Sequence, residues 1–557
     1  MLEVDLEPAI PTETEPVAAR EPAEIAELEQ QADHRFRTGT DDCGLTAARA
    51  LGDPDRMGRI IDRWGVDLAH SAHGALMFEI AAELPLDLAT SLPGLGFRFE
   101  DIGRLPIGTT PIGLPRTARE AEAEFARHGD LRLRQALLPL VTRRRLGRFD
   151  EAMAIVRAAV PLAEASVYPW YGERGRILPY WHLQAGITAQ VAGDLDAARR
   201  WFLSAWTHHT RDPYGFVARA IAGKLALVDA VRGDHVASAT WLERAGEQTR
   251  RPDLWIDRFV ESNLTATAAI RASDALDPQA ESRLGAMPHP TQRGEQWAVF
   301  LWIHVSHALA RGDAGRASRY LDDALEAQRD EVSGSGLAAG LVRLLRADVH
   351  LALGQANQAL AELDGAPDIA GAARVVRART LLLSGDPTPA LHEAELVVQD
   401  DTASPRAATE ALLVVAAARH AAGDRPGAVA ALRRAVGRVQ EQDLARALAT
   451  VPRTALDDLA SDVPALAALL AVLDERGVVD VYPAAVSLIT VTKRERDLLS
   501  DLSSGISLTE IAKANYVSIN TTRTHLANLR RKLDARSRDE VVVRARQLGL
   551  LQQPPRD

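Results

Sequence analysis

Apolar and polar residues follow one another with the period of an α-helix along most of this chain. Beyond about residue 30, apolar positions recur every three or four residues over stretches of roughly 12 to 16 residues. Most stretches end at a Gly followed by Asp or another polar residue. We find no alternating runs of the kind that form strands, so the pattern predicts an all-α fold.

The Gly-containing breaks recur along the chain. The glycines at successive breaks are 31 to 46 residues apart, except for one gap of 79 residues. That gap is close to twice a spacing of 40, which indicates a degenerate repeat near Ala272–Leu276. The glycines that mark the breaks are Gly147, Gly193, Gly233, Gly312, Gly354, Gly385 and Gly423.

Such spacing is typical of helical hairpins. A Gly can adopt the left-handed conformation that ends one helix, and an Asp after it can cap the next. Each hairpin alone buries only one face, so neighbours must stack. We predict a tetratricopeptide-like α-solenoid over roughly residues 40–470, within a helical-repeat domain bounded at 31–476. An irregular helical bundle with chance Gly-Asp turns is the alternative.

Composition agrees with helices and narrows the class. Ala, Leu and Arg dominate, and aromatic residues make up only 5%. The single Cys43 excludes a disulfide framework and CxxC-type metal sites. Residues 1–30 are acidic and Pro-rich, which predicts a disordered tail rather than a signal peptide. The sequence contains no uninterrupted run of 18 apolar residues, so it predicts no membrane span, and we expect a cytoplasmic protein.

Two interruptions divide the chain further. Residues 102–117 contain three Pro and three Gly, which predicts a loop. Residues 477–487 contain Pro483 and predict a linker to a terminal domain at 488–553.

Charge separates that terminal domain from the rest. Between residues 488 and 552 there are 12 Lys or Arg against 7 Asp or Glu, which leaves a net −16 elsewhere in a chain of net charge −11. Three of the four lysines lie in this segment. A basic module on an acidic body is the charge distribution expected of a nucleic-acid-binding domain.

The terminal domain shows three predicted capping boxes, in which a Ser or Thr caps a helix and a Glu three residues later bonds back. They are Thr492–Glu495, Ser507–Glu510 and Ser537–Glu540. A further cap at Ser518 opens a helix over INTTRTHLANLRRKL, so four helices are expected.

The predicted helices carry apolar residues at core spacing. A short helix, a turn at Asn515–Val517 and a longer basic helix are typical of a helix-turn-helix, whose second helix enters the major groove. The positions expected in the core are Leu498, Leu499, Leu502, Ile511, Ala512, Thr522, Leu526, Leu529, Leu533, Val541, Val542, Ala545 and Leu548.

These residues resemble the LuxR-type helix-turn-helix, also called NarL/FixJ-type or GerE-type. The resemblance covers about 60 residues. The positions that match the family's pattern are Thr492, Arg494, Glu495, Leu498, Gly505, Ser507, Glu510, Ile511, Ala512, Ser518, Thr521, His525, Leu529, Lys532, Leu533, Arg538 and Glu540.

The resemblance implies a set of DNA-binding residues. Arg523 and Thr524 would face base edges, with Ala527 one turn further along; Asn528 and Arg531 are included in the same surface. Thr521, Lys532 and the Ser518 hydroxyl would lie near backbone phosphate. Independently of the family, Arg is suited to bidentate bonds with guanine, and Lys or Arg beside phosphate adds affinity without sequence information.

The chain also departs from the family. Thr522-Arg523 replaces the usual Val-Lys, and Ala527 occupies a position that is frequently basic, so a relative's base preference cannot be transferred. The last helix resembles the family's dimerisation helix, which implies a homodimer on a two-fold DNA site. The alternative for Arg523, Arg530 and Arg531 is an ordinary solvated basic face.

The helical front part, joined to this domain, resembles the large ATP-binding LuxR regulators. Their ATPase domain is not expected here. A phosphate-binding loop needs GxxxxGK[ST], whereas Lys224 follows Gly223 without the upstream Gly or a following Ser or Thr. Nor do we find a receiver domain, and we expect no cofactor and no enzymatic activity.

Other candidate sites have simpler interpretations. The histidine pairs His70/His73, His304/His307 and His208/His209 lack a predictable third ligand, which favours surface or groove histidines over a metal site. The aromatic residues Trp201, Trp206 and Trp241 fall at helix-packing positions, although solenoid grooves also use aromatics to hold ligands.

We therefore predict a sequence-specific DNA-binding transcription regulator whose partners are double-stranded DNA and RNA polymerase. Its helical repeats would sense an unknown effector or protein partner. The alternative is a helical-repeat scaffold whose terminal module does not bind DNA.

Overall fold

The fold is described from a computed structural model of the chain. It describes residues 114–128, 131–165, 177–212, 214–292, 294–329 and 335–551, with isolated residues between 49 and 85. The predicted tail at 1–30, most of the predicted loop at 102–117, Cys43 and the His70/His73 pair lie outside this part. All regular structure in the described residues is helical, which confirms the all-α class. None of the described helices has the length and apolar character needed to cross a membrane.

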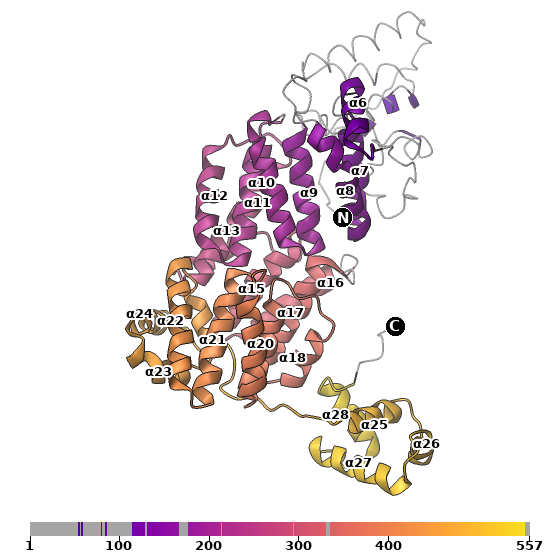
Figure 1. Ribbon diagram of the computed structural model, residues 1–557, viewed down its shortest axis with the longest axis vertical. Coiled ribbons are helices and arrows are strands. Elements are labelled where there is room, and N and C mark those ends of the chain that lie inside the picture. Colours follow the sequence, from indigo (N-terminus) through magenta and orange to yellow (C-terminus); the bar gives the residue numbers. More distant parts are fainter. Residues whose placement is uncertain are drawn as a thin grey trace, which may run out of the picture.

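The described chain runs through a long series of helices before the terminal domain (Figure 1). The first part contains α6 (Ala118–His128), α7 (Leu131–Arg145), α8 (Phe149–Ala165), α9 (Leu178–Ala192), α10 (Leu195–Thr207), α11 (Val217–Arg232), α12 (His235–Glu247), α13 (Asp257–Asp274) and α14 (Ala280–Gly285). The second contains α15 (Trp297–Ala310), α16 (Ala314–Ala327), α17 (Gly336–Ala352), α18 (Ala356–Leu363), α19 (Ala372–Leu383), α20 (Pro387–Gln399), α21 (Pro405–Ala421), α22 (Arg425–Gln442), α23 (Arg453–Leu459) and α24 (Pro464–Glu475). Short 3₁₀ helices connect some of them, including η3 (Ala445–Thr450).

Most of these helices form stacked hairpins. Helix α9 packs on α10, α11 on α12, α15 on α16, α17 on α18, α19 on α20 and α21 on α22. The first helix of each hairpin also packs on the first helix of the next, in the series α9, α11, α13, α15, α17, α19 and α21. The result is an extended array in which each hairpin contacts mainly its neighbours. Its assignment to the tetratricopeptide type remains a prediction.

The predicted Gly turns are present in the structure. All seven glycines have positive φ, between 71° and 98°. The predicted degenerate repeat also contains a left-handed turn. Leu276 lies between α13 and α14 and has a φ of 60°. Asp194, Asp234, Asp313 and Asp424 each accept a bond from the backbone N–H three residues later, as N-caps do.

The turn after α11 requires glycine at position 233 for two reasons. Its φ is 81°, a conformation that costs an L-residue about 1–2 kcal/mol. A Cβ at this position would also lie 2.8 Å from Cβ of Arg406, on α21. The turn after α11 therefore meets α21, far away in sequence, at close range.

The segment expected to be a linker has no helix between residues 478 and 492, but it is held against the array. The Val481 N–H donates to the carbonyl of Ala449 at 2.9 Å, and the Val486 N–H donates to that of Leu383 at 2.9 Å. The Tyr482 side chain is buried. A free tether would show none of these contacts, so the segment gives the start of the terminal domain a defined position.

The terminal domain contacts the array at α18. The Asn357 side chain donates to the Ile489 carbonyl and accepts from its N–H, both at 2.9 Å. At the far end of the domain, Gly549 lies so close to α18 that a Cβ would be 3.2 Å from Cα of Gln358. Both ends of the domain therefore rest on one helix of the array.

Candidate nucleic-acid interface

Four helices make up the terminal domain: α25 (Lys493–Ser503), α26 (Leu508–Ala514), α27 (Ile519–Lys532) and α28 (Arg538–Gln547) (Figure 1). Two of the three expected capping boxes are complete, at Thr492–Glu495 and Ser507–Glu510. The third is half formed. Ser537 accepts from the Glu540 N–H at 3.0 Å, but the Glu540 carboxylate bonds the N–H of Arg536 instead of the cap residue.

The four helices close around a small apolar core of their own. Most of the predicted core positions are buried, whereas Leu526, Val542 and Leu548 are only partly buried and pack against its edge. The buried members are Leu498, Leu499, Leu502, Ile511, Leu529, Leu533, Ala535, Val541 and Ala545. Because this core is separate from that of the array, it fixes α27 relative to α26 within the domain.

The predicted turn between α26 and α27 is sharp. Tyr516 has φ 53°, in the left-handed region, and its side chain is 96% exposed. Ser518 then starts α27 by accepting from the Thr521 N–H at 3.0 Å, with its hydroxyl also 2.8 Å from that of Thr521. The cap and the turn orient α27 so that one of its sides faces away from the domain.

Helix α27 has a buried side and an exposed side. Thr522 and Leu529 are buried, whereas Arg523, Thr524 and Ala527 are exposed. At about 100° per residue, the exposed stripe that also includes Asn520 and Arg531 spans about 100° of the helix surface. The helix contains four basic residues and no acidic one, so this surface carries positive charge alone.

Among the described residues, no hydrogen bond or ion pair involves the Arg523 side chain, which leaves its guanidinium open to an external acceptor. Thr524 donates its hydroxyl to the Asn520 carbonyl at 2.9 Å within the helix. Within the described part of the chain, the Arg531 side chain hydrogen-bonds the Asn528 side chain alone, at 3.5 Å. The predicted base-facing residues therefore lie together on one accessible face, while their contact with DNA stays a prediction.

Lys532 lies in a different setting. Its Nζ is 2.7 Å from the Glu495 carboxylate and 3.0 Å from the Thr490 carbonyl. Burial alone would raise the pKa of the Glu495 carboxyl, but bonds from Lys532 and from the Thr492 N–H hold that pKa below its usual value. Much of the charge of Lys532 is thus neutralised inside the domain. Arg530 is exposed, but its guanidinium bonds the carbonyls of Ala535 and Arg536 in the turn after α27.

Sequence reasoning missed Asn520 as a candidate. Its side chain is exposed in the first turn of α27, one turn before Arg523 and Thr524. The Ser518 cap could have indicated this residue from the sequence. With Ser518 as the N-cap, residue 520 is the second residue of the helix and lies beside the face that carries Arg523.

The remaining candidates lie in the array. Lys224 is buried in α11, where its Nζ is 3.4 Å from the Gln190 side chain. Trp206 stacks on His209 at 4.0 Å, and Trp241 meets Trp206 edge-on at 5.3 Å. In the part of the chain that the structure describes, no three His, Cys, Asp or Glu side chains converge as a metal site would require.

Comparisons with known proteins bear on the terminal domain. Residues 490–545 match the family described as bacterial regulatory proteins, luxR family. The chain is also similar to response regulator protein VraR of Staphylococcus aureus, Staphylococcus saprophyticus and Staphylococcus epidermidis, with 37% identity over 62 residues in each case. That similarity covers 11% of this chain and 30% of each relative. Together with the capped helices, the separate core and the basic exposed face, these matches identify residues 490–545 as a helix-turn-helix domain of the luxR family.

Proposed function

We propose that this protein is a sequence-specific DNA-binding transcription regulator that places α27 in the major groove of double-stranded DNA. The supporting observation is the exposed stripe on α27, in which Arg523 has no partner among the described residues while the opposite side of the helix is buried. A helix held in this way can present side chains to base edges without unfolding.

The proposed contacts fall into two classes. Arg523 and Thr524 face base edges, with Asn520, Ala527 and Arg531 beside them. The hydroxyls of Ser518 and Thr521 and the side chain of Asn528 lie near backbone phosphate. We place Lys532 mainly in support of the domain, because its ammonium group already bonds Glu495.

The regulator acts as a homodimer on a two-fold site, and α28 provides the contact between copies. Val543 supports this assignment, since it is an apolar side chain on α28 that is 50% exposed. The helical array senses an effector or protein partner, and DNA-bound protein contacts RNA polymerase in the cytoplasm.

Selection of bound sequences from a random DNA pool tests the proposal. The purified full-length chain should enrich one motif with two-fold symmetry at about 0.1 M salt. On that motif, Arg523→Ala should weaken binding by about 5- to 150-fold, which corresponds to the 1–3 kcal/mol of a bidentate base contact.

Arg434→Ala is the matched control. Arg434 is exposed on α22 of the array, so the variant deletes the same atoms and charge away from α27. It should leave affinity within about twofold. If no motif is enriched, the terminal module is not a DNA reader and the scaffold alternative takes its place. If a motif is enriched but Arg523→Ala binds it as the wild type does, Arg523 makes no base contact.

A further inference from the structure

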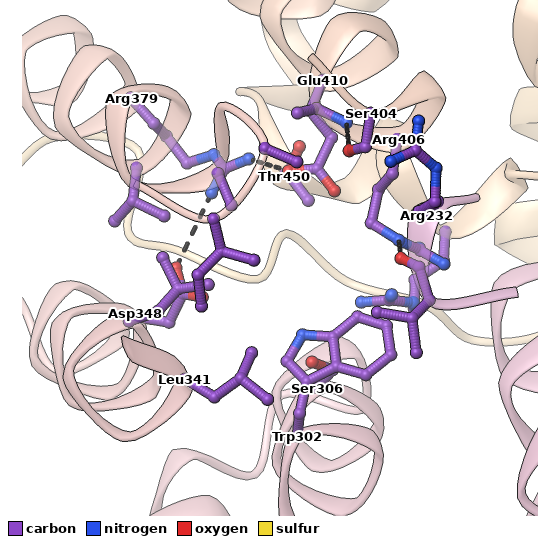
Figure 2. Close-up of a pocket in the computed structure, with 18 of the residues that line it drawn as sticks. Arg232, Trp302, Ser306, Leu341, Asp348, Arg379, Ser404, Arg406, Glu410 and Thr450 are labelled. Carbon is purple, nitrogen blue, oxygen red and sulfur yellow. Dashed lines mark hydrogen bonds and ion pairs between the residues drawn. The ribbon is translucent and has the colours of Figure 1, made fainter. Parts of the chain in front are cut away.

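The array contains a cavity that borders the segment leading to the terminal domain. Its space amounts to about 840 Å³, counted with the part that is open to solvent. Figure 2 shows side chains converging on it from α15, α17, α19 and α21. Val481 and Tyr482 of the extended segment also line it.

One side of the cavity is polar and rich in hydrogen-bond donors. Arg379 is buried, with Nη2 at 2.7 Å from the Glu410 carboxylate and Nη1 at 3.1 Å from the Tyr482 hydroxyl. Its Nε–H is buried without a hydrogen-bond partner. A buried donor left unpaired is unfavourable, so an acceptor that reached it from the cavity would supply the missing hydrogen bond.

Two further arginines add donors. Arg406 and Arg446 both bond the carboxylate of Asp274, at 2.5 Å and 2.6 Å. Their Nη1 groups make no hydrogen bond with a described residue. The Asp274 carboxylate therefore accepts from two guanidinium groups. The Nη1 donors of both arginines are left without an acceptor among the described residues.

The other side of the cavity is apolar. Figure 2 shows Trp302 and Leu341 across the space from Arg379 and Glu410. The Arg406 guanidinium lies 5.0 Å from the centre of the Trp302 ring, so the arginine side and the apolar side of the cavity meet at this contact. The lining is thus divided into a donor-rich wall and an apolar wall, which suits a ligand of the same two-sided character.

We propose that this cavity is the effector site of the regulator, and that it binds a small organic anion, a carboxylate or phosphate group on an apolar or aromatic body. The anionic group bonds the arginine wall, and the body packs against Trp302 and Leu341. This inference rests on the proposed regulatory function.

The cavity also has a route to the terminal domain. Tyr482 donates its hydroxyl to Asp348 at 2.7 Å and accepts from Arg379, so it forms part of the wall that meets the anion. Burial raises the pKa of the Asp348 carboxyl to about 6, against the lowering effect of Arg379, which marks this wall as poorly solvated. Seven residues after Tyr482, Ile489 is bonded to α18, and α25 begins soon afterwards. A ligand that contacts Tyr482 and Arg379 together therefore stabilises the docked segment.

Naphthalene-2-carboxylate, 2-naphthyl phosphate and the neutral naphthalene-2-carboxamide are suitable probes. We expect the full-length chain to bind at least one of the two anions at a single saturable site, at least tenfold more tightly than the amide, in isothermal titration calorimetry. The stronger of the two anions identifies the head group. Equal binding of the amide, or no saturable binding of either anion below about 1 mM, overturns the proposal.

Two serine variants locate the site. Ser306 is half-buried and lines the cavity, so Ser306→Leu should fill it and weaken anion binding at least tenfold. Ser318→Leu makes the same change on α16 outside the cavity and should leave affinity unchanged. Equal affinity in the two variants overturns the assignment of the site.

Hydrogen exchange of the saturated complex tests the route. The amides of Val481 and Val486 should exchange at least fivefold more slowly than in the free chain, and unchanged exchange refutes the coupling. None of these measurements contains DNA. A failure of the DNA selection with intact anion binding therefore counts against the proposed function alone, and the reverse result counts against the cavity alone.

Discussion

The contact between Lys532 and Glu495 leads to a prediction about what holds the terminal domain together. Glu495 is 3% exposed, and its carboxylate accepts from Lys532 at 2.7 Å and from the Thr492 N–H at 2.8 Å. The Lys532 side chain is 30% exposed. Replacement of Lys532 by Met keeps the apolar stem but leaves a nearly buried carboxylate without its cation.

The expected loss lies between two limits. Breaking a fully buried pair costs about 3–5 kcal/mol, and an exposed pair contributes about 0–1 kcal/mol. With one partner buried and the other about one-third exposed, we expect Lys532→Met to destabilise the domain by about 2 kcal/mol. Glu495→Gln should cost about 1 kcal/mol, and the double variant about 1 kcal/mol less than the sum.

Hydrogen exchange on the full-length chain is the assay, because opening free energies of α25 and α27 report this domain separately from the array. Arg523→Ala is the control, since its side chain has no partner among the described residues and its loss should leave these values within about 0.5 kcal/mol. A coupling below about 0.5 kcal/mol between Lys532 and Glu495 would refute the reasoning. It would also restore Lys532 as a cation available for phosphate.

Three further predictions concern the turn, the docking contact and the acid response. In thermal unfolding, Gly233→Ala should destabilise the array by about 2–3 kcal/mol, because its φ is positive and the new Cβ would meet Arg406. Gly385→Ala should cost about 1–2 kcal/mol, because its φ is similar but no atom of the described residues lies within 4 Å of the new Cβ. Asn357→Ala removes both bonds to the segment before α25, so small-angle scattering should show a larger maximum dimension than for the wild type, and an identical profile would contradict the docking. The pKa of Glu495 is lowered in the folded domain, so the unfolded state takes up the proton first as pH falls below about 4.3. The domain should therefore lose stability as pH falls through the pKa that Glu495 has in the folded state. In Glu495→Gln, the opening free energy of α27 should depend less steeply on pH.

Local features of this fold were predictable from the sequence. The left-handed glycines, the Asp caps and the order of helices in the terminal domain each depend on residues a few positions apart. Two of these features differ from the prediction. Asp386 precedes α20 without accepting a cap bond through its side chain, and the box at Ser537 is half formed because the Glu540 carboxylate accepts from the N–H of Arg536 at the same helix end.

Long-range contacts were not predictable in this way. Tyr482 was assigned to a linker on the strength of the neighbouring Pro483, yet it is bonded to Asp348, 134 residues earlier. The Lys532–Glu495 pair spans 37 residues and depends on how α27 crosses α25. Periodicity describes which face of a helix is apolar, but it does not state which distant side chain will meet a given charge.

The contact between Arg523 and guanine is the most direct test of the proposed DNA reader. Fluorescence anisotropy on the selected motif should compare ordinary DNA with DNA in which one guanine at a time is replaced by 7-deazaguanine, which lacks the N7 acceptor. We predict that one such replacement per half-site weakens the wild type by at least fivefold and leaves Arg523→Ala unaffected. If every replacement weakens both proteins equally, Arg523 does not read guanine, and α27 does not lie in the groove as proposed.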